Sequence, residues 1–134
     1  MSLKDKIKII PRRLISDDRG WFLKVIDGTE DYLPKFTGEI YLTNATEGQA
    51  KGSHYHNIAN EWFTLITGEC ELKLVDIVTK EKQTIYLSSK KSETIFVPNK
   101  IAHIFINNTC KDFILLAYTD KLYIPEDTIP FSDF

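Results

Sequence analysis

Four side chains in this sequence have the types and spacing of a functional pocket. His54 and His56 are separated by one residue, so on a strand both point to the same face, and a following antiparallel strand can bring Glu61 opposite them. His103, the remaining histidine of the chain, precedes a strand-like run and can complete the set. Three imidazoles and a carboxylate suit Zn, Fe, Mn or Ni. They also suit acid–base chemistry, because the unperturbed pKa of imidazole is about 6.5.

The elements that must position these side chains are strands. Short runs rich in Ile, Val, Thr, Phe and Tyr recur between turn residues, and positions 69–74 alternate charged and apolar residues, as a strand with one buried face does. No long window keeps a helical apolar period, and only 120–131 has room for a helical turn. The spacing favours an all-β sandwich or jelly-roll barrel, with strands at 7–10, 21–26, 39–45, 62–67, 69–78, 83–87, 94–97, 104–107 and 113–119.

Length and composition narrow the class further. A chain of 134 residues predicts a single domain, and a formal charge of −2 from 17 basic and 19 acidic residues, without a basic stripe, argues against nucleic acid as a partner. The sequence has neither a signal peptide nor an apolar run of the ~18 residues that a membrane span needs, so we expect a cytoplasmic protein with no membrane contact. In that reducing compartment, Cys70 and Cys110 are expected to be free thiols.

The histidine spacing closely resembles the two sequence motifs of the cupins. The first motif matches at Gly48, His54, His56, Glu61 and Gly68, and the second at Pro98, His103 and Asn107, with Lys100 in place of the usual glycine. This resemblance implies an all-β double-stranded β-helix, a jelly-roll barrel formed by one domain over 1–134. Early strands would occupy about 7–45, the barrel core about 48–119 and a C-terminal tail 120–134. It also implies that a divalent metal, if bound, is held by His54, His56, Glu61 and His103.

A closer resemblance covers most of the chain, through 18–22, 38–41, 51–56 and the tail segment 123–128. These segments look like those of bacterial nucleotide-sugar cupins: dTDP-4-dehydrorhamnose 3,5-epimerases, dTDP-sugar 3,4-ketoisomerases and the C-terminal cupin domain of capsular-polysaccharide reductases. The chemistry implied is removal of a proton beside the ketone of a nucleotide-linked 4-keto-6-deoxysugar, in the biosynthesis of surface polysaccharides. No organic cofactor is expected.

The resemblance gives the candidate residues roles. His54 is the candidate base, His56 a relay or a group that polarises the carbonyl, and Tyr41 a proton donor, because it shares one strand face with the alternate positions after it. Lys51 or Arg19 would meet the diphosphate of the substrate. Across the early strand 21–26 we expect a homodimer, as in related cupins.

Two departures separate the chain from the 3,5-epimerases. Ala117 occupies the position of their acid tyrosine, and Tyr118 faces the other way. Glu61 occupies the position of their catalytic lysine. An isomerase or a C3 epimerase therefore fits better. The metal constrains the mechanism, because a His54 bound to metal has no lone pair left for a proton. Two other readings stay open: a metal-dependent dioxygenase or lyase, and a non-catalytic module that binds sugar nucleotides.

Overall fold

The structure, a computed structural model, describes residues 1–28 and 38–134. In these residues the only helices are one short α-helix and one 3-10 turn, and neither has the length to cross a membrane. The elements are α1 (Leu3–Lys6), β1 (Lys8–Pro11), β2 (Leu14–Asp17), β3 (Gly20–Leu23), β4 (Ile40–Ala45), β5 (Ala50–Tyr55), β6 (Glu61–Thr67), β7 (Glu69–Asp76), β8 (Lys82–Ser88), β9 (Glu93–Val97), β10 (Ile101–Ile106), β11 (Phe113–Thr119), the 3-10 turn η1 (Pro125–Asp127) and β12 (Ile129–Pro130).

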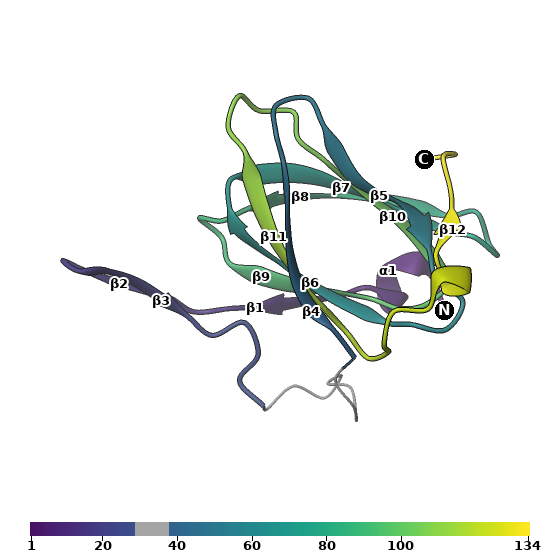
Figure 1. The fold of residues 1–134 in the computed structure, drawn as a ribbon, viewed down its shortest axis with the longest axis horizontal. Helices are drawn as coiled ribbons and strands as arrows, with labels where there is room; N and C mark the ends of the chain where they lie inside the picture. Colours follow the sequence, from purple (N-terminus) through teal and green to yellow (C-terminus); the bar gives the residue numbers. More distant parts are fainter. Residues whose placement is uncertain (29–37) are drawn as a thin grey trace.

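Two five-stranded antiparallel sheets form a barrel, whose ring of strands is seen nearly end-on in Figure 1. One sheet has the order β1-β9-β6-β11-β4 and the other β12-β5-β10-β7-β8. Large side chains from both sheets fill the interior, among them Phe63, Phe105 and Phe113, none more than 2% exposed. The jelly-roll barrel predicted from the sequence is therefore confirmed.

The strand alternation fixes which side chains reach this interior. In β7, Cys70, Leu72 and Leu74 are 5%, 0% and 0% exposed, while the residues between them lie at the surface or half-buried. Burying each leucine stabilises the fold by about 1.5–3 kcal/mol. Both cysteines are free thiols, as predicted: Cys70 packs in the core and Cys110 is exposed.

Several elements differ from the sequence prediction. The strand expected at 104–107 begins at Ile101 and contains His103, and the strand that carries His54 ends at Tyr55, so His56 lies just past it. β2 was not predicted, because all four of its residues are exposed and no alternation marks it. Leu3 joins no strand pattern, yet it is 1% exposed and packs into the core from α1, whose N-terminus is capped by Ser2.

The two-stranded sheet of β2 and β3, here called the N-terminal hairpin, projects away from the barrel (Figure 1). Its side chains include Trp21 and Phe22, each 56% exposed. β4 lies at the open edge of its sheet, and the outward-facing Ile40 and Leu42 are 62% and 65% exposed. The hairpin and this edge together present a large apolar surface.

Candidate active site

The four residues singled out by their spacing meet at one end of the barrel. His54 on β5 and His103 on β10 are direct cross-strand partners, and Glu61 begins β6 in the facing sheet. One potential ligand atom from each of His54, His56, Glu61 and His103 lies within 4.8 Å of the other three. The structure therefore assembles the predicted cluster from three strands and a loop.

A bulge in β5 gives His54 its place in this cluster. His103 pairs with His54 and Ile104 pairs with Gly52, so Ser53 has no residue opposite it. Gly52 and Ser53 have φ angles of 103° and 67°, in the left-handed region that favours glycine. A Cβ at Gly52 would lie 2.7 Å from the carbonyl oxygen of His103, so this close approach of two strands requires glycine.

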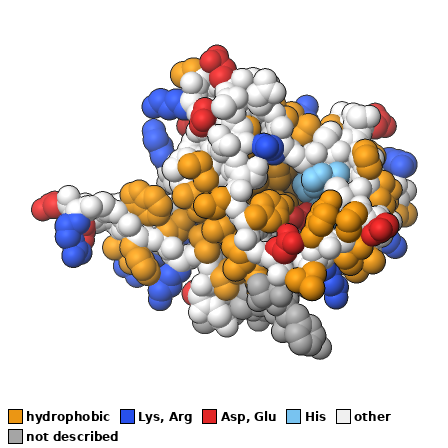
Figure 2. Space-filling view, in the orientation of Figure 1, with side chains coloured by type: hydrophobic (Ala, Val, Ile, Leu, Met, Phe, Trp, Pro, Cys, Tyr) orange, Lys and Arg blue, Asp and Glu red, His pale blue; other side chains and the backbone are white. Residues whose placement is uncertain are grey.

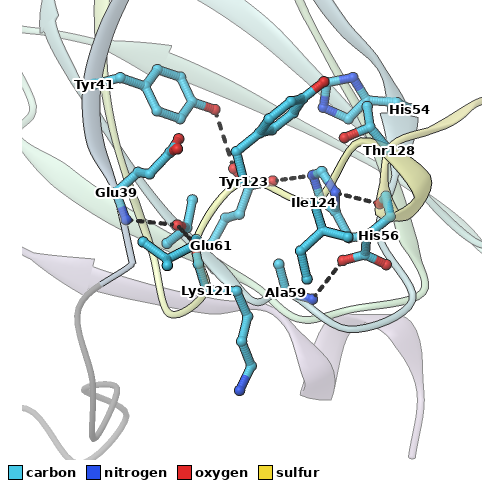
Figure 3. A pocket seen from close by; sticks show the side chains of 13 residues that line it. Glu39, Tyr41, His54, His56, Ala59, Glu61, Lys121, Tyr123, Ile124 and Thr128 are labelled. Atoms are coloured by element: carbon cyan, nitrogen blue, oxygen red, sulfur yellow. Dashed lines mark hydrogen bonds and ion pairs between the residues drawn. The ribbon is translucent and has the colours of Figure 1, made fainter.

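Glu61 lies between the histidines and Tyr41. Its Oε1 is 2.7 Å from Nε2 of His56, and its Oε2 accepts a hydrogen bond of 3.2 Å from the Tyr41 hydroxyl (Figure 3). The same Oε1 is 3.4 Å from Nε2 of His103. The 2.7 Å approach does not have hydrogen-bond geometry. Within the described part of the chain, both Glu61 Oε1 and His56 Nε2 are buried with no hydrogen-bond partner. Buried polar atoms are rarely left so, and their common direction suits a shared cation.

The opposite nitrogens of two imidazoles are bound to the backbone. His56 Nδ1 lies 2.8 Å from the carbonyl oxygen of Asp127, and His103 Nδ1 lies 3.2 Å from that of Ile101. A carbonyl accepts only, so each ring carries a proton on Nδ1. Neutral His103 turns its Nε2 lone pair toward Glu61, whereas protonation of His56 would place an N–H on Nε2, facing the Glu61 carboxylate. This arrangement is typical of histidines that bind a metal.

Burial and charge set the protonation of the cluster. Burial lowers the pKa of His103 to about 4, although the Glu61 carboxylate acts in the opposite direction. For His54, burial and then the neighbouring His56 lower the pKa. Burial lowers the pKa of His56 too, but Glu61 outweighs it, and the pKa lies above its ordinary value. Burial would raise the pKa of Glu61, yet the three histidines hold it below its ordinary value. Near neutral pH, Glu61 is therefore ionised and His103 neutral.

Tyr41 is held in its protonated form. Burial raises the pKa of its hydroxyl above the usual value, and the charge of Glu61, its hydrogen bond to Glu61 and the charge of Glu39 raise it further. On the neighbouring strand, Ala117 is the direct cross-strand partner of Tyr41 and is fully buried. Tyr118 faces the other way, as expected, and packs on Trp62 with ring centroids 5.7 Å apart. The phenol of Tyr41 therefore lies beside Ala117, whose own side chain carries no hydroxyl.

The cluster opens into a cavity of about 180 Å³. Figure 2 shows a pale blue histidine surface inside a hollow, with several hydrophobic side chains on its rim. One wall comes from the tail, through Tyr123, Ile124 and Thr128 (Figure 3). Sites for drug-sized ligands measure about 300–1,000 Å³, so this cavity matches a single sugar ring rather than a whole nucleotide sugar.

Asp127 attaches the tail to the pocket. Its buried carboxylate accepts hydrogen bonds from the backbone N–H groups of Asn57, Ile58 and Ala59, at 2.8, 3.0 and 3.0 Å. The loop after His56 and the tail wall thereby form one unit. Because the Asp127 carbonyl also contacts His56, the same residue orients a member of the histidine cluster.

The other residues predicted from the sequence lie in different places. Tyr41, His54, His56 and Glu61 line the cavity, and buried His103 supports the cluster from behind. Lys51 is exposed on β5 and Arg19 lies at the turn of the N-terminal hairpin, where its side chain is 90% exposed and pairs with Asp17 at 2.6 Å. Neither is among the residues that line the cavity.

The sequence reasoning did not assign a role to Glu39, Tyr123 or Asp127, all of which line the cavity. Glu39 had a readable signal, because it precedes Tyr41 by two positions in an extended segment and so shares its inner face. Tyr123 and Asp127 belong to the tail, where no periodic pattern reports which side chains turn inward.

Comparison with known proteins places the chain in a family. Residues 15–129 match the polysaccharide biosynthesis C-terminal domain. The chain is 25% identical over 138 residues to the spore coat polysaccharide biosynthesis protein SpsL of Bacillus subtilis (strain 168), covering 96% of this chain and 91% of that protein.

Two further relatives are similar in part or in fold. The chain is 23% identical over 112 residues to the UDP-2-acetamido-2,6-beta-L-arabino-hexul-4-ose reductase of Pseudomonas aeruginosa, covering 84% of this chain but only 28% of that enzyme. Its fold is similar to the crystal structure of the dTDP-6-deoxy-D-glucose-3,5-epimerase RmlC from Legionella pneumophila in complex with dTDP-4-keto-L-rhamnose, with a TM-score of 0.85, 19% identity and coverage of 99% and 76%. The chain therefore belongs to the polysaccharide biosynthesis C-terminal domain family, and its fold is the cupin barrel.

Proposed function

We propose that this protein is an isomerase or epimerase that removes a proton beside the ketone of a nucleotide-linked 4-keto-6-deoxysugar, in the biosynthesis of a surface polysaccharide. The observation that carries the proposal is a sugar-sized cavity beside three imidazoles and a carboxylate, whose ligand atoms lie within 4.8 Å of one another, and a phenol that hydrogen-bonds to the carboxylate. These are groups that accept, donate and stabilise charge near neutral pH. The family match to polysaccharide biosynthesis supports the same pathway class.

The relatives support the choice of substrate class. One is named as a reductase of a UDP-linked hexulose, and another was crystallised with dTDP-4-keto-L-rhamnose. The cavity here takes one sugar ring, so the nucleotide would lie outside it, across the exposed side chains of Leu122 and Tyr123, which are 73% and 65% exposed. An aromatic ring at the mouth gives a base a surface on which to stack.

The site also fits a divalent metal. His54, His56, Glu61 and His103 would hold it, because their ligand atoms converge and two of those atoms are buried without a hydrogen bond. A metal held there supplies Lewis acidity toward the keto oxygen of the substrate. The protonated phenol of Tyr41, fixed against Glu61, is placed to donate a hydrogen bond or a proton to the oxygen on which negative charge develops.

Solvent exchange tests this function. The protein is incubated in D2O with dTDP- or UDP-4-keto-6-deoxyglucose, and NMR follows deuterium at the carbons beside the ketone. We expect exchange at C3 with the wild-type protein and a large loss in Tyr41→Phe. Tight binding of these nucleotide sugars without any exchange would instead support a non-catalytic binding module.

Zinc titration followed by calorimetry tests the metal site separately. The wild-type protein is expected to bind one equivalent, and Glu61→Gln to bind it at least about 10-fold more weakly, because a charged ligand is lost. Equal affinity in the two proteins would contradict the assignment of Glu61 as a ligand.

We further propose that the protein is a homodimer. Two copies related by a two-fold axis can cover the exposed apolar residues of the N-terminal hairpin and of the open β4 edge, and the hairpin projects too far from its own barrel to cover that edge itself (Figure 1). Light scattering at micromolar concentration is expected to give twice the chain mass, and Trp21→Glu to shift it toward the monomer. A wild-type monomer at that concentration would contradict the proposal.

A further inference from the structure

A metal held by the four ligands leaves the reaction without its most obvious base. Each imidazole that binds a metal gives up the lone pair that would accept a proton, and Glu61 would be occupied in the same way. Another side chain of the cavity can then serve as the base. We propose that this base is Glu39, an inference that rests on the proposed function.

Glu39 is the carboxylate that the other contacts leave available. Three acidic side chains line the cavity: Glu39, Glu61 and Asp127. Glu61 is engaged by His56 and Tyr41, and the carboxylate of Asp127 accepts three backbone N–H groups. The Glu39 carboxylate has no hydrogen bond or ion pair within residues 1–28 and 38–134. Figure 3 shows it turned inward, toward the hydroxyl of Tyr41.

The backbone around Glu39 is fixed, so its side chain starts from a defined position. Its N–H donates to Oγ1 of Thr119 at 3.1 Å, and its carbonyl accepts from the N–H of Thr119 at 2.8 Å. The preceding Gly38 donates to the carbonyl of Thr119 at 2.8 Å and packs so closely on Lys121 that it has no room for a Cβ. Two segments that are distant in sequence thus hold one carboxylate at the cavity wall, which is the preorganisation that a base requires.

The proposed step balances without any further reactant. A Glu39 carboxylate oxygen forms a bond to the hydrogen of the carbon beside the ketone, that C–H bond breaks, and its electron pair moves into the carbonyl to give an enolate. Glu39 becomes a carboxylic acid and exchanges its proton with water. Return of a proton from water to the other face of that carbon gives the epimer. Protonation of the enolate oxygen by water instead gives an enediol, which becomes the isomeric ketone when its other hydroxyl loses a proton to water and the former carbonyl carbon gains one. Tyr41 lies where it can hydrogen-bond the enolate oxygen.

The test compares Glu39→Gln and Glu39→Ala with the wild-type protein and with Glu47→Gln, a matched control at an exposed position in the turn after β4. Deuterium exchange into dTDP- and UDP-4-keto-6-deoxyglucose is measured in D2O, and zinc affinity is measured for each protein. We expect exchange to fall at least about 100-fold in both Glu39 variants, and zinc affinity to stay within about 2-fold of wild type. Added formate is expected to restore part of the exchange in Glu39→Ala, because it supplies a carboxylate to the vacated space.

The outcomes separate this inference from the proposed function. Wild-type exchange together with undiminished exchange in Glu39→Gln would overturn the role of Glu39 and leave the function standing. Zinc affinity that falls as far in Glu39→Gln as in Glu61→Gln would make Glu39 a metal ligand and also overturn its role as base. Absence of exchange in the wild-type protein would overturn the function and the inference together.

Discussion

Replacing Asp127 tests how the tail is attached to the pocket. In Asp127→Ala, the backbone N–H groups of Asn57, Ile58 and Ala59 lose the one carboxylate that accepts all three. Asp127→Asn is a milder change. Its single amide oxygen can still accept from Asn57 and Ile58, which share Oδ1, but its NH2 group would face the N–H of Ala59.

The expected cost follows from these contacts. A hydrogen bond to a charged group contributes about 1.5–3 kcal/mol. If all three hydrogen bonds were fully buried, their loss would cost the sum of three such contributions to the free energy of unfolding. Asn57 and Ile58 are exposed, however, so water can replace part of the hydrogen bonding that is lost. We therefore expect the free energy of unfolding to fall by about 3 kcal/mol in Asp127→Ala and by about 1.5 kcal/mol in Asp127→Asn.

Thermal unfolding followed by circular dichroism measures the loss, and about 3 kcal/mol corresponds to a decrease in Tm of about 10 °C for a chain of this size. Hydrogen exchange should show faster exchange at the amides of residues 57–59. Asp133→Ala is the matched control, because Asp133 lies in the same tail with a side chain 92% exposed. A Tm within about 1 °C of wild type for Asp127→Ala, with residues 57–59 still protected, would refute the reasoning.

Three further changes probe the rest of the fold. Lys100 has φ of 62° and donates its N–H to the carbonyl of His56 at 2.6 Å. Lys100→Gly should therefore relieve backbone strain and raise the free energy of unfolding, measured by urea titration, by about 1 kcal/mol. A loss of stability would contradict this. Gly38→Ala would place a Cβ among the backbone atoms of Lys121, so we expect a protein that stays folded by circular dichroism with at least about 10-fold weaker nucleotide-sugar binding; wild-type binding would show that the wall adapts. Burial would raise the pKa of Asp76, but hydrogen bonds from Lys6 and two backbone N–H groups hold the pKa below its ordinary value. The ionised carboxylate therefore stabilises the fold above about pH 4, and this contribution is lost as the pH falls further. Denaturant titrations should therefore show the stability difference between wild type and Asp76→Asn shrinking below pH 4, and a constant difference would contradict the assignment.

The barrel and its histidine cluster were predictable because both depend on regular patterns. The alternation through Leu72 and Leu74 reports directly which face of the strand is buried. His54, His56 and Glu61 are close in sequence, and the loop after His56 carries the chain from β5 to β6 in the facing sheet, not to a paired neighbouring strand as the sequence had suggested, so that Glu61 faces the two histidines. His103 was predictable from its place in the second cupin motif.

The walls of the cavity were harder to predict, because they depend on packing between distant segments. Glu39 owes its position to hydrogen bonds with Thr119, 80 residues later in the chain. Asp127 has an ordinary tail sequence around it, and only the docked structure shows that its carboxylate binds the loop after His56. Arg19 is the opposite case, a residue that the sequence predicted for the site but that lies outside the cavity. Its sequence neighbourhood resembles that of the nucleotide-sugar cupins, yet the projecting hairpin carries it away from the cavity of its own chain.

The attachment of the tail by Asp127 also separates two levels of stability in this protein. The residues of the main hydrophobic cluster end at Ala117, and none of them comes from the tail, residues 120–134. The other strands of the barrel can therefore remain folded while the tail detaches and its edge strand β12 separates from β5, in a partial opening whose free energy is smaller than that of global unfolding. In that open form the cavity has lost a wall and His56 has lost the carbonyl that orients it. A protease that samples the native protein would then cut first near residues 121–126, inactivating the site while the barrel survives intact.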